Sequence, residues 1–183
     1  MNKLFGSITS CVIALAAAGS AQAGASAPAS VCPPGSQVDC NWLTVDSTAK
    51  TATFALTAGQ TALNSGLNFN GFNEGKLTLT VPVGWNVVLR FTNKDQNLTH
   101  SAEVVDTASA MPAGPVDPPA FPRAMTVKLM QGLSSGDSDT VRFVAGKAGS
   151  YMIFCGVPGH GLAGMWIRLK VSATDKRPTL ATS

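Results

Sequence analysis

The sequence predicts an all-β protein, an antiparallel sandwich of about seven to nine strands. Short segments alternate apolar with polar residues, 18 glycines are available for turns, and no long segment repeats its apolar residues with the 3.6-residue period of a helix. The length of 183 residues fits one domain preceded by a leader. We expect residues 24–40 to be a flexible segment, 41–175 the domain and 176–183 a C-terminal tail.

The alternating segments place the expected strands in chain order. They are Trp42–Asp46, Thr51–Thr57, Lys76–Val81, Trp85–Thr92, His100–Val105, Met125–Met130, Thr140–Ala145, Ser150–Cys155 and Met165–Ser172. Successive side chains of a strand point to opposite faces. Leu77, Leu79 and Val81 should therefore share the inner face of one strand, and Cys155 should point into the end of the sandwich.

The N-terminus has the features of a secretory signal peptide over residues 1–23. Lys3 is the positive charge, Cys11–Ala18 is the apolar stretch, and Ala21–Ala23 is a small-residue cleavage site. The apolar stretch is too short to span a bilayer, and no later segment is apolar enough. These features predict a periplasmic or otherwise extracytoplasmic protein whose mature chain has no transmembrane segment.

The cysteines are also distributed as expected for an exported protein. Cys11 would leave with the signal peptide, and Cys32 and Cys40 flank a short loop. In an oxidising compartment a disulfide between these two is the default expectation. Cys155 is then the odd thiol, and it would oxidise or mispair unless something such as a metal ion occupied it.

The charge balance excludes some partners. The formal net charge is +3, only 13% of residues are charged, and there is no basic run or glycine-rich phosphate loop. Nucleic acid is therefore not an expected partner. The 10 Asp and Glu residues are few, which would suit an acidic exterior because few groups change charge on protonation.

One glycine-rich loop carries the chemistry. Cys155, His160 and Met165 follow one another with four residues between each pair. Thiolate, imidazole and thioether are ligands that copper takes when it cycles between Cu(I) and Cu(II). A second imidazole would complete a His₂Cys site with a weak axial Met, and the other of the chain's 2 histidines is His100. The sequence predicts one blue-copper site in an electron carrier, not an enzyme.

Other interpretations explain fewer of these residues. Taken singly, a buried Cys or Met usually fills apolar space, and His100 alone would be a solvated turn residue. Multicopper oxidases and copper nitrite reductases need more histidines, a binuclear copper site needs two bridging cysteines, and structural zinc does not favour Met. A Cys/His hydrolase would leave His100 and Met165 unexplained. A copper-binding or copper-delivery protein of the same fold stays open.

The loop resembles the copper loop of cupredoxins, and its Cys-x4-His-x4-Met spacing is similar to that of sulfocyanins and rusticyanins. Leu67–Gly71, Val81–Asn86 and the strand before His100 also resemble the sulfocyanin pattern. The resemblance implies a Greek-key cupredoxin sandwich and one type 1 copper. The ligands it implies are His100, Cys155, His160 and Met165. The long Pro-rich stretch after His100 and the Cys-bearing N-terminal segment depart from the pattern.

Neighbouring residues would tune such a site. The resemblance implies that Ser101, directly after the first histidine, sends a hydrogen bond to the ligating sulfur. Val157, Pro158, Leu162 and Ala163 would surround the edge of His160 with apolar atoms, exclude water and favour Cu(I). The alternative that these residues merely pack the loop stays open. The same apolar patch would dock a redox protein partner of the cytochrome or terminal oxidase type.

The Pro-rich stretch, residues 109–123, is too rich in proline for a core strand. It predicts a long loop, whose length is compatible with a partner-specific surface, although such loops are more often passive connections. Met111, Met125 and Met130 lie in or after it, and their apolar context favours core packing over Cu(I) handling.

Overall fold

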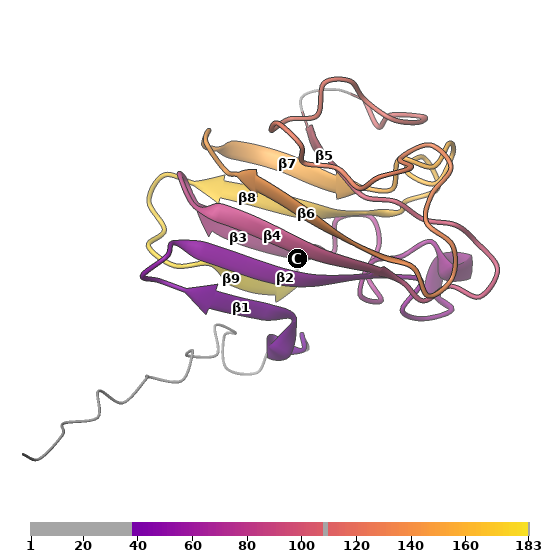
Figure 1. The fold of residues 1–183 in the computed structure, drawn as a ribbon, viewed down its shortest axis with the longest axis horizontal. Helices are drawn as coiled ribbons and strands as arrows, with labels where there is room; N and C mark the ends of the chain where they lie inside the picture. Colours follow the sequence, from indigo (N-terminus) through magenta and orange to yellow (C-terminus); the bar gives the residue numbers. More distant parts are fainter. Residues whose placement is uncertain (1–37, 108–109, 183) are drawn as a thin grey trace, which may run out of the picture.

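The computed structural model describes residues 38–107 and 110–182, which form a two-layered β-sandwich (Figure 1). The predicted signal peptide and Cys32, and with it the predicted Cys32–Cys40 disulfide, lie outside the described residues. Helix within the described part is limited to two 3₁₀ turns, η1 (Cys40–Trp42) and η2 (Leu63–Gly66). Within residues 38–107 and 110–182, no helix is long and apolar enough to cross a membrane.

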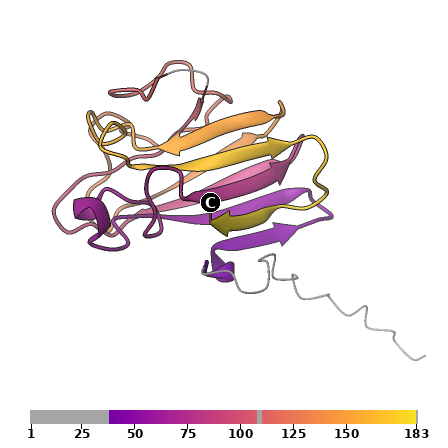
Figure 2. The same cartoon turned by 180° about the vertical axis from the view of Figure 1, so that it is seen from behind.

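The described residues form nine strands in two sheets. The first sheet has the order β1 (Leu43–Asp46), β2 (Thr51–Ala58), β4 (Asn86–Asn93) and β6 (Ser138–Val144). The second has the order β5 (Glu103–Asp106), β7 (Gly149–Phe154), β8 (Trp166–Ser172), β3 (Leu77–Pro82) and β9 (Thr179–Thr182). Figure 2 shows the second sheet from behind, with β7 and β8 side by side.

The all-β sandwich is confirmed, but each sheet is mixed. β2 pairs with β4 in parallel, and β3 pairs with β8 in parallel, while the other strand pairs are antiparallel. The reason is the chain's path: it leaves the first sheet after β2, contributes β3 to the second sheet, and returns to lay β4 beside β2. Alternation within a strand carries no information on which strands become neighbours.

The core lies between the two sheets, where the predicted inner faces meet. Leu77, Leu79 and Val81 of β3 are fully buried, and so are Ile167 and Leu169 of β8. Burying one such side chain contributes about 2 kcal/mol. The predicted inward direction of these rows is confirmed, and Ile153 of β7 and Cys155, directly after β7, belong to the same core.

The segment 125–130 is not a strand. Only Met125 pairs, in an isolated bridge to Glu103, because positive φ angles at Arg123 (64°) and Lys128 (51°) break the extended backbone on either side. Met125 and Met130 are 41% and 55% exposed, so the expectation that they pack in the core was wrong. Met111 is partly buried and packs against a smaller cluster on the outer side of β7.

Two boundaries also differ from the prediction. β5 begins at Glu103 rather than at His100, which instead bridges to Leu133 through two backbone hydrogen bonds of 3.1 and 2.7 Å. The expected tail contains β9, which pairs with β3 and buries Leu180 completely. No strand was expected there, because a four-residue strand in which Leu180 is the one large apolar side chain gives almost no periodic signal.

Candidate metal centre

Three of the four predicted ligand side chains meet at one end of the sandwich. Potential ligand atoms of His100, Cys155 and His160 all lie within 4.8 Å of one another. The Cys155 Sγ atom is 3.9 Å from Nδ1 of His100 and 3.5 Å from Nδ1 of His160. The two imidazole rings are 5.1 Å apart and tilted by 58°. His100 precedes β5, and the other two follow β7, so the cluster joins distant parts of the chain.

The loop after β7 folds back so that its two ends are adjacent. The Cys155 N–H donates to the Met165 carbonyl (3.1 Å), and the Met165 N–H donates to the His160 carbonyl (3.0 Å). Gly159 and Gly164 have φ angles of 83° and 92°, which side chains with a Cβ rarely adopt. Met165 is fully buried in the same core cluster as Cys155, directly before β8.

Cys155 is a fully buried free thiol whose sulfur receives a main-chain hydrogen bond. The donor is the Ser101 N–H, at 3.4 Å, while the Ser101 hydroxyl is 3.9 Å from the sulfur. That hydroxyl donates to the Leu129 carbonyl (2.7 Å) and accepts from the Gly156 N–H (3.1 Å). Burial raises the pKa of the thiol, and the hydrogen bonds from Ser101 and Val157 oppose this shift.

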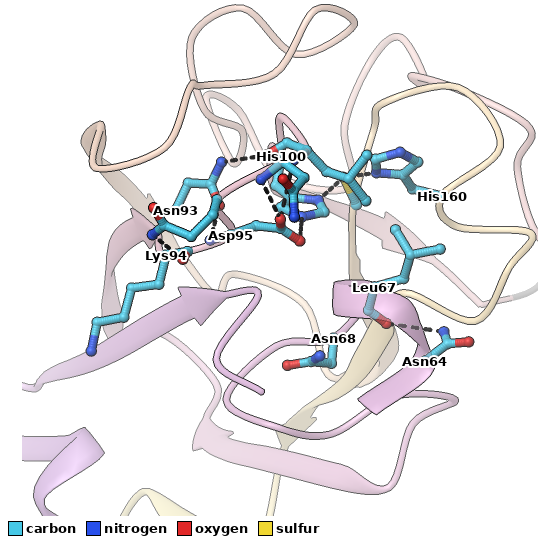
Figure 3. A network of polar contacts seen from close by, with 12 residues as sticks. Asn64, Leu67, Asn68, Asn93, Lys94, Asp95, His100 and His160 are labelled. Carbon is cyan, nitrogen blue, oxygen red and sulfur yellow. Dashed lines mark hydrogen bonds and ion pairs between the residues drawn. The ribbon is translucent and has the colours of Figure 1, made fainter. Parts of the chain in front are cut away.

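His100 has a carboxylate partner that our sequence analysis missed. Its Nε2 atom lies 3.1 Å from Oδ2 of Asp95, and the imidazole is completely buried (Figure 3). Burial lowers the pKa of His100, against the effect of the Asp95 charge. Burial raises the pKa of Asp95, but hydrogen bonds from Asn97, His100 and Leu98 outweigh this and leave it lowered. The only signal in the sequence was an aspartate five residues before the histidine.

His160 is the outer member of the cluster, partly exposed at the surface. Burial and the neighbouring His100 lower its pKa. Of the residues expected around its edge, Val157 packs partly buried against the core and Pro158 is exposed. Leu162, on the same loop, is 59% exposed. Apolar side chains on the loop that carries His160 are therefore exposed at the surface.

The Pro-rich loop, defined here as residues 110–123, packs against the ligand loop. The Gly159 N–H donates to the Ala113 carbonyl at 2.8 Å. At its middle, the Val116 N–H donates to the buried carboxylate of Glu103 on β5 (3.1 Å). Near its end, the Ala120 N–H bonds to the Val104 carbonyl (2.8 Å). The Pro-rich loop is thus anchored to the sheet and supports the ligand loop.

The donor set fits copper. One sulfur and two imidazole nitrogens face one another in a site whose inner members are fully buried. The cluster contains no carboxylate oxygen, which magnesium and calcium require. Soft sulfur together with imidazole favours copper or zinc, and a thioether ligand from the buried Met165, whose backbone bonds to Cys155 and His160, would favour copper.

Comparisons with known proteins agree with this geometry. The family model described as the sulfocyanin (SoxE) domain matches residues 39–181. Sulfocyanin from Sulfolobus acidocaldarius is 30% identical over 120 residues, a match that spans 61% of this chain and 58% of that protein.

Solved structures with a similar fold are also cupredoxins. Crystal structures of rusticyanin variants superpose with a TM-score of 0.50 at 22% identity, over 67% of this chain and 78% of theirs. Rusticyanin from Thiobacillus ferrooxidans gives 0.48 at 22% identity, over 72% of this chain and 86% of its own. Auracyanin from Roseiflexus castenholzii gives 0.47 at 25% identity, over 66% and 96%. By its family match and its cupredoxin sandwich, the chain belongs to the sulfocyanin (SoxE) domain family.

Proposed function

We propose that the protein is an exported mononuclear blue-copper protein that passes single electrons between redox partners and is not an enzyme. One observation carries the proposal: the buried Cys155 sulfur lies between Nδ1 of His100, at 3.9 Å, and Nδ1 of His160, at 3.5 Å. Membership in the sulfocyanin family supports it. In this proposal Met165 is the weak axial ligand and the site is a single type 1 copper.

The residues around the site are suited to this role. Bound copper supplies a one-electron Cu(I)/Cu(II) couple. The Cys155 sulfur is held by the Ser101 N–H, and the backbones of His160 and Met165 are tied together at 3.0 Å. A sulfur and a loop backbone held in this way would move little when the charge of the bound ion changes, which would keep electron transfer fast. Complete burial of His100 and Cys155 keeps water from the sulfur.

The exposed edge of His160 is the proposed route for the electron. Leu162 and Pro158, each two positions from His160 on the same loop, have exposed side chains that would lie around this edge. An apolar patch of this kind would dock a redox protein of the cytochrome or terminal oxidase type without a strong charge preference. Val157, partly buried against the core, would shield the imidazole from water.

A copper-delivery role is the second candidate, favoured by the exposure of two thioethers. Met125 and Met130 are 41% and 55% exposed, and thioethers are ligands for Cu(I). The two roles differ in what happens on reduction. A carrier keeps its copper through repeated reduction and oxidation, whereas a delivery protein gives up Cu(I) to a chelator.

We also propose the processing and the boundaries of the chain. Residues 1–23 would be removed as a signal peptide, which would place the protein in the periplasm or another extracytoplasmic space. Cys32 and Cys40 would form a disulfide in the flexible segment 24–40, ahead of a domain that begins near residue 41. Mass spectrometry of the exported protein, before and after reduction, tests both the cleavage site and the disulfide.

The central test is a visible spectrum of the copper-loaded protein. We expect an intense thiolate-to-copper band that Cys155→Ser abolishes, because the band requires the sulfur. Met152→Leu is the matched control, since it removes a sulfur from the opposite face of β7 and should leave the band unchanged. Voltammetry in the presence of a Cu(I) chelator should show repeated cycling without metal loss. A colourless Cu(II)-treated protein would contradict the proposed site, and copper loss on reduction would favour delivery.

A further inference from the structure

A buried carboxylate lies on the far side of His100 from the sulfur. The His100 ring has its Nδ1 atom 3.9 Å from the Cys155 Sγ and its Nε2 atom 3.1 Å from the Asp95 Oδ2 (Figure 3). The side chains of His100 and Asp95 are 0% and 8% exposed. No hydrogen bond joins His160 to a carboxylate among the described residues. The two histidines of the cluster are therefore held differently.

Hydrogen bonds within its own turn hold the Asp95 carboxylate in position beside the imidazole. Its Oδ1 atom accepts from the N–H groups of Asn97 (2.9 Å) and Leu98 (3.1 Å). The Asp95 N–H donates to the Asn93 side chain at 2.9 Å, and the Asn93 amide donates in turn to the Leu98 carbonyl. Gly66 packs so closely against the Asp95 Oδ2 that a Cβ there would collide with it. The turn thus holds one oxygen and leaves the other for the imidazole.

We propose that Asp95 is a positioning residue of the copper site. An ionised carboxylate only accepts hydrogen bonds, so the Nε2 atom of His100 must carry the ring proton and Nδ1 keeps its lone pair for the metal. A carboxylate on the outer nitrogen of a ligating histidine also makes the imidazole a stronger donor. Asp95 therefore favours Cu(II) over Cu(I) and opposes the apolar shell around His160, which has the reverse effect.

Asp95→Asn separates this role from simple turn formation. The two N–H groups of Asn97 and Leu98 require an acceptor at the Oδ1 position, so the new amide oxygen stays there and the NH₂ group faces Nε2 of His100. Two donors then face each other, and the ring prefers the tautomer with its proton on Nδ1. We expect Cu(II) affinity to fall about 10- to 100-fold and the reduction potential to rise.

Asp46→Asn is the matched control. Asp46 is exposed, and it accepts from the Ala49 N–H (2.8 Å) in the turn between β1 and β2, at the other end of the sandwich (Figure 1). The Asp46→Asn substitution makes the same change of charge as Asp95→Asn, also in a turn where the aspartate accepts a main-chain N–H. Asp46, however, has no histidine partner. Equal copper affinity and equal potential in the two variants would overturn the proposal.

A measurement on the copper-free wild-type protein keeps the proposal testable if Asp95→Asn does not fold. Nitrogen NMR of the His100 ring, at a pH where the imidazole is neutral, should show the proton on Nε2. A proton on Nδ1 would overturn the proposal. The effect on copper affinity rests on the proposed function, but the tautomer does not. Wild-type protein that binds no copper would therefore refute the function and leave the NMR result to decide the role of Asp95.

Discussion

At the residue scale, the shortest hydrogen bond to the Cys155 sulfur from Ser101 comes from its main chain and not from its side chain. The Ser101 N–H reaches it at 3.4 Å, and the Ser101 hydroxyl is occupied by the Leu129 carbonyl and the Gly156 N–H. A main-chain donor cannot be removed by a side-chain substitution. Ser101 therefore holds two loops together with its hydroxyl and supplies the sulfur's hydrogen bond with its backbone.

This division of roles predicts the behaviour of Ser101→Ala. The substitution leaves the buried Gly156 N–H without its acceptor, which costs about 1–3 kcal/mol of stability, but it keeps the N–H on the sulfur. We expect lower stability in denaturant unfolding with little change in reduction potential. Ser138→Ala, which removes an exposed hydroxyl paired with Thr92, should cost about 0.5 kcal/mol or less. A large shift in potential at unchanged stability would show that the hydroxyl tunes the sulfur.

The residues that make the cluster could be predicted from the sequence, but their partners could not. Cys155, His160 and His100 are identified by ligand chemistry and by the scarcity of histidine, and neither depends on knowing the fold. Asp95 is different. An aspartate in a polar turn is usually solvated, and neither its contact with His100 nor the close packing of Gly66 against it can be predicted from the sequence.

At the scale of elements, two loops of different composition hold the site in place. The ligand loop after β7 supplies two of the clustered side chains, and the Pro-rich loop braces it through the Ala113 carbonyl. Proline content predicted that residues 110–123 would not be a core strand, and none of the nine strands lies there. It could not predict what the loop packs against, because that is set by its anchors, Glu103 and Val104.

Gly161→Ala tests the contact between these loops. A Cβ at Gly161 would lie 2.7 Å from Cδ2 of Phe154 on β7, so the ligand loop must shift, and 3.3 Å from the Pro112 carbonyl oxygen, so the Pro-rich loop must give by a few tenths of an ångström. We expect a loss of about 1–3 kcal/mol of stability and weaker copper binding in a chelator competition. Gly146→Ala is the control, because the nearest atom to its Cβ would be 3.9 Å away. If both variants bind copper like wild type, the contact does not support the site.

At the scale of the whole molecule, the sheet topology brings the ligands together. His100 follows β4 of the first sheet, and Cys155 follows β7 of the second. The faces of these strands could be predicted from alternation. The parallel pairings of β2 with β4 and of β3 with β8 could not, since they depend on where the chain crosses between sheets. The members of the cluster could thus be predicted from ligand chemistry, but the strand pairings that bring them together could not.

The buried carboxylate of Glu103 gives the folded molecule a dependence on pH. It is 1% exposed, and its Oε1 has no hydrogen-bond partner among the described residues. Burial raises the pKa of Glu103 from 4.5 to about 7, the Val116 N–H opposes this, and the charge of Asp117 adds to it. The folded state therefore binds this proton more tightly than the unfolded state, so its contribution to stability is complete below pH 4.5 and is lost as the pH rises through about 7.

Glu103→Gln should remove this dependence. The change in pKa from 4.5 to about 7 corresponds to at most about 3 kcal/mol. We expect the free energy of unfolding of the wild type, relative to Glu103→Gln, to fall by up to that amount between acidic and mildly alkaline pH. The comparison is needed because the lowered pKa values of His100 and His160 act in the opposite direction. Glu74→Gln, on an exposed carboxylate paired with Lys76, is the control. Parallel pH profiles for all three proteins would show that Glu103 ionises freely in the fold.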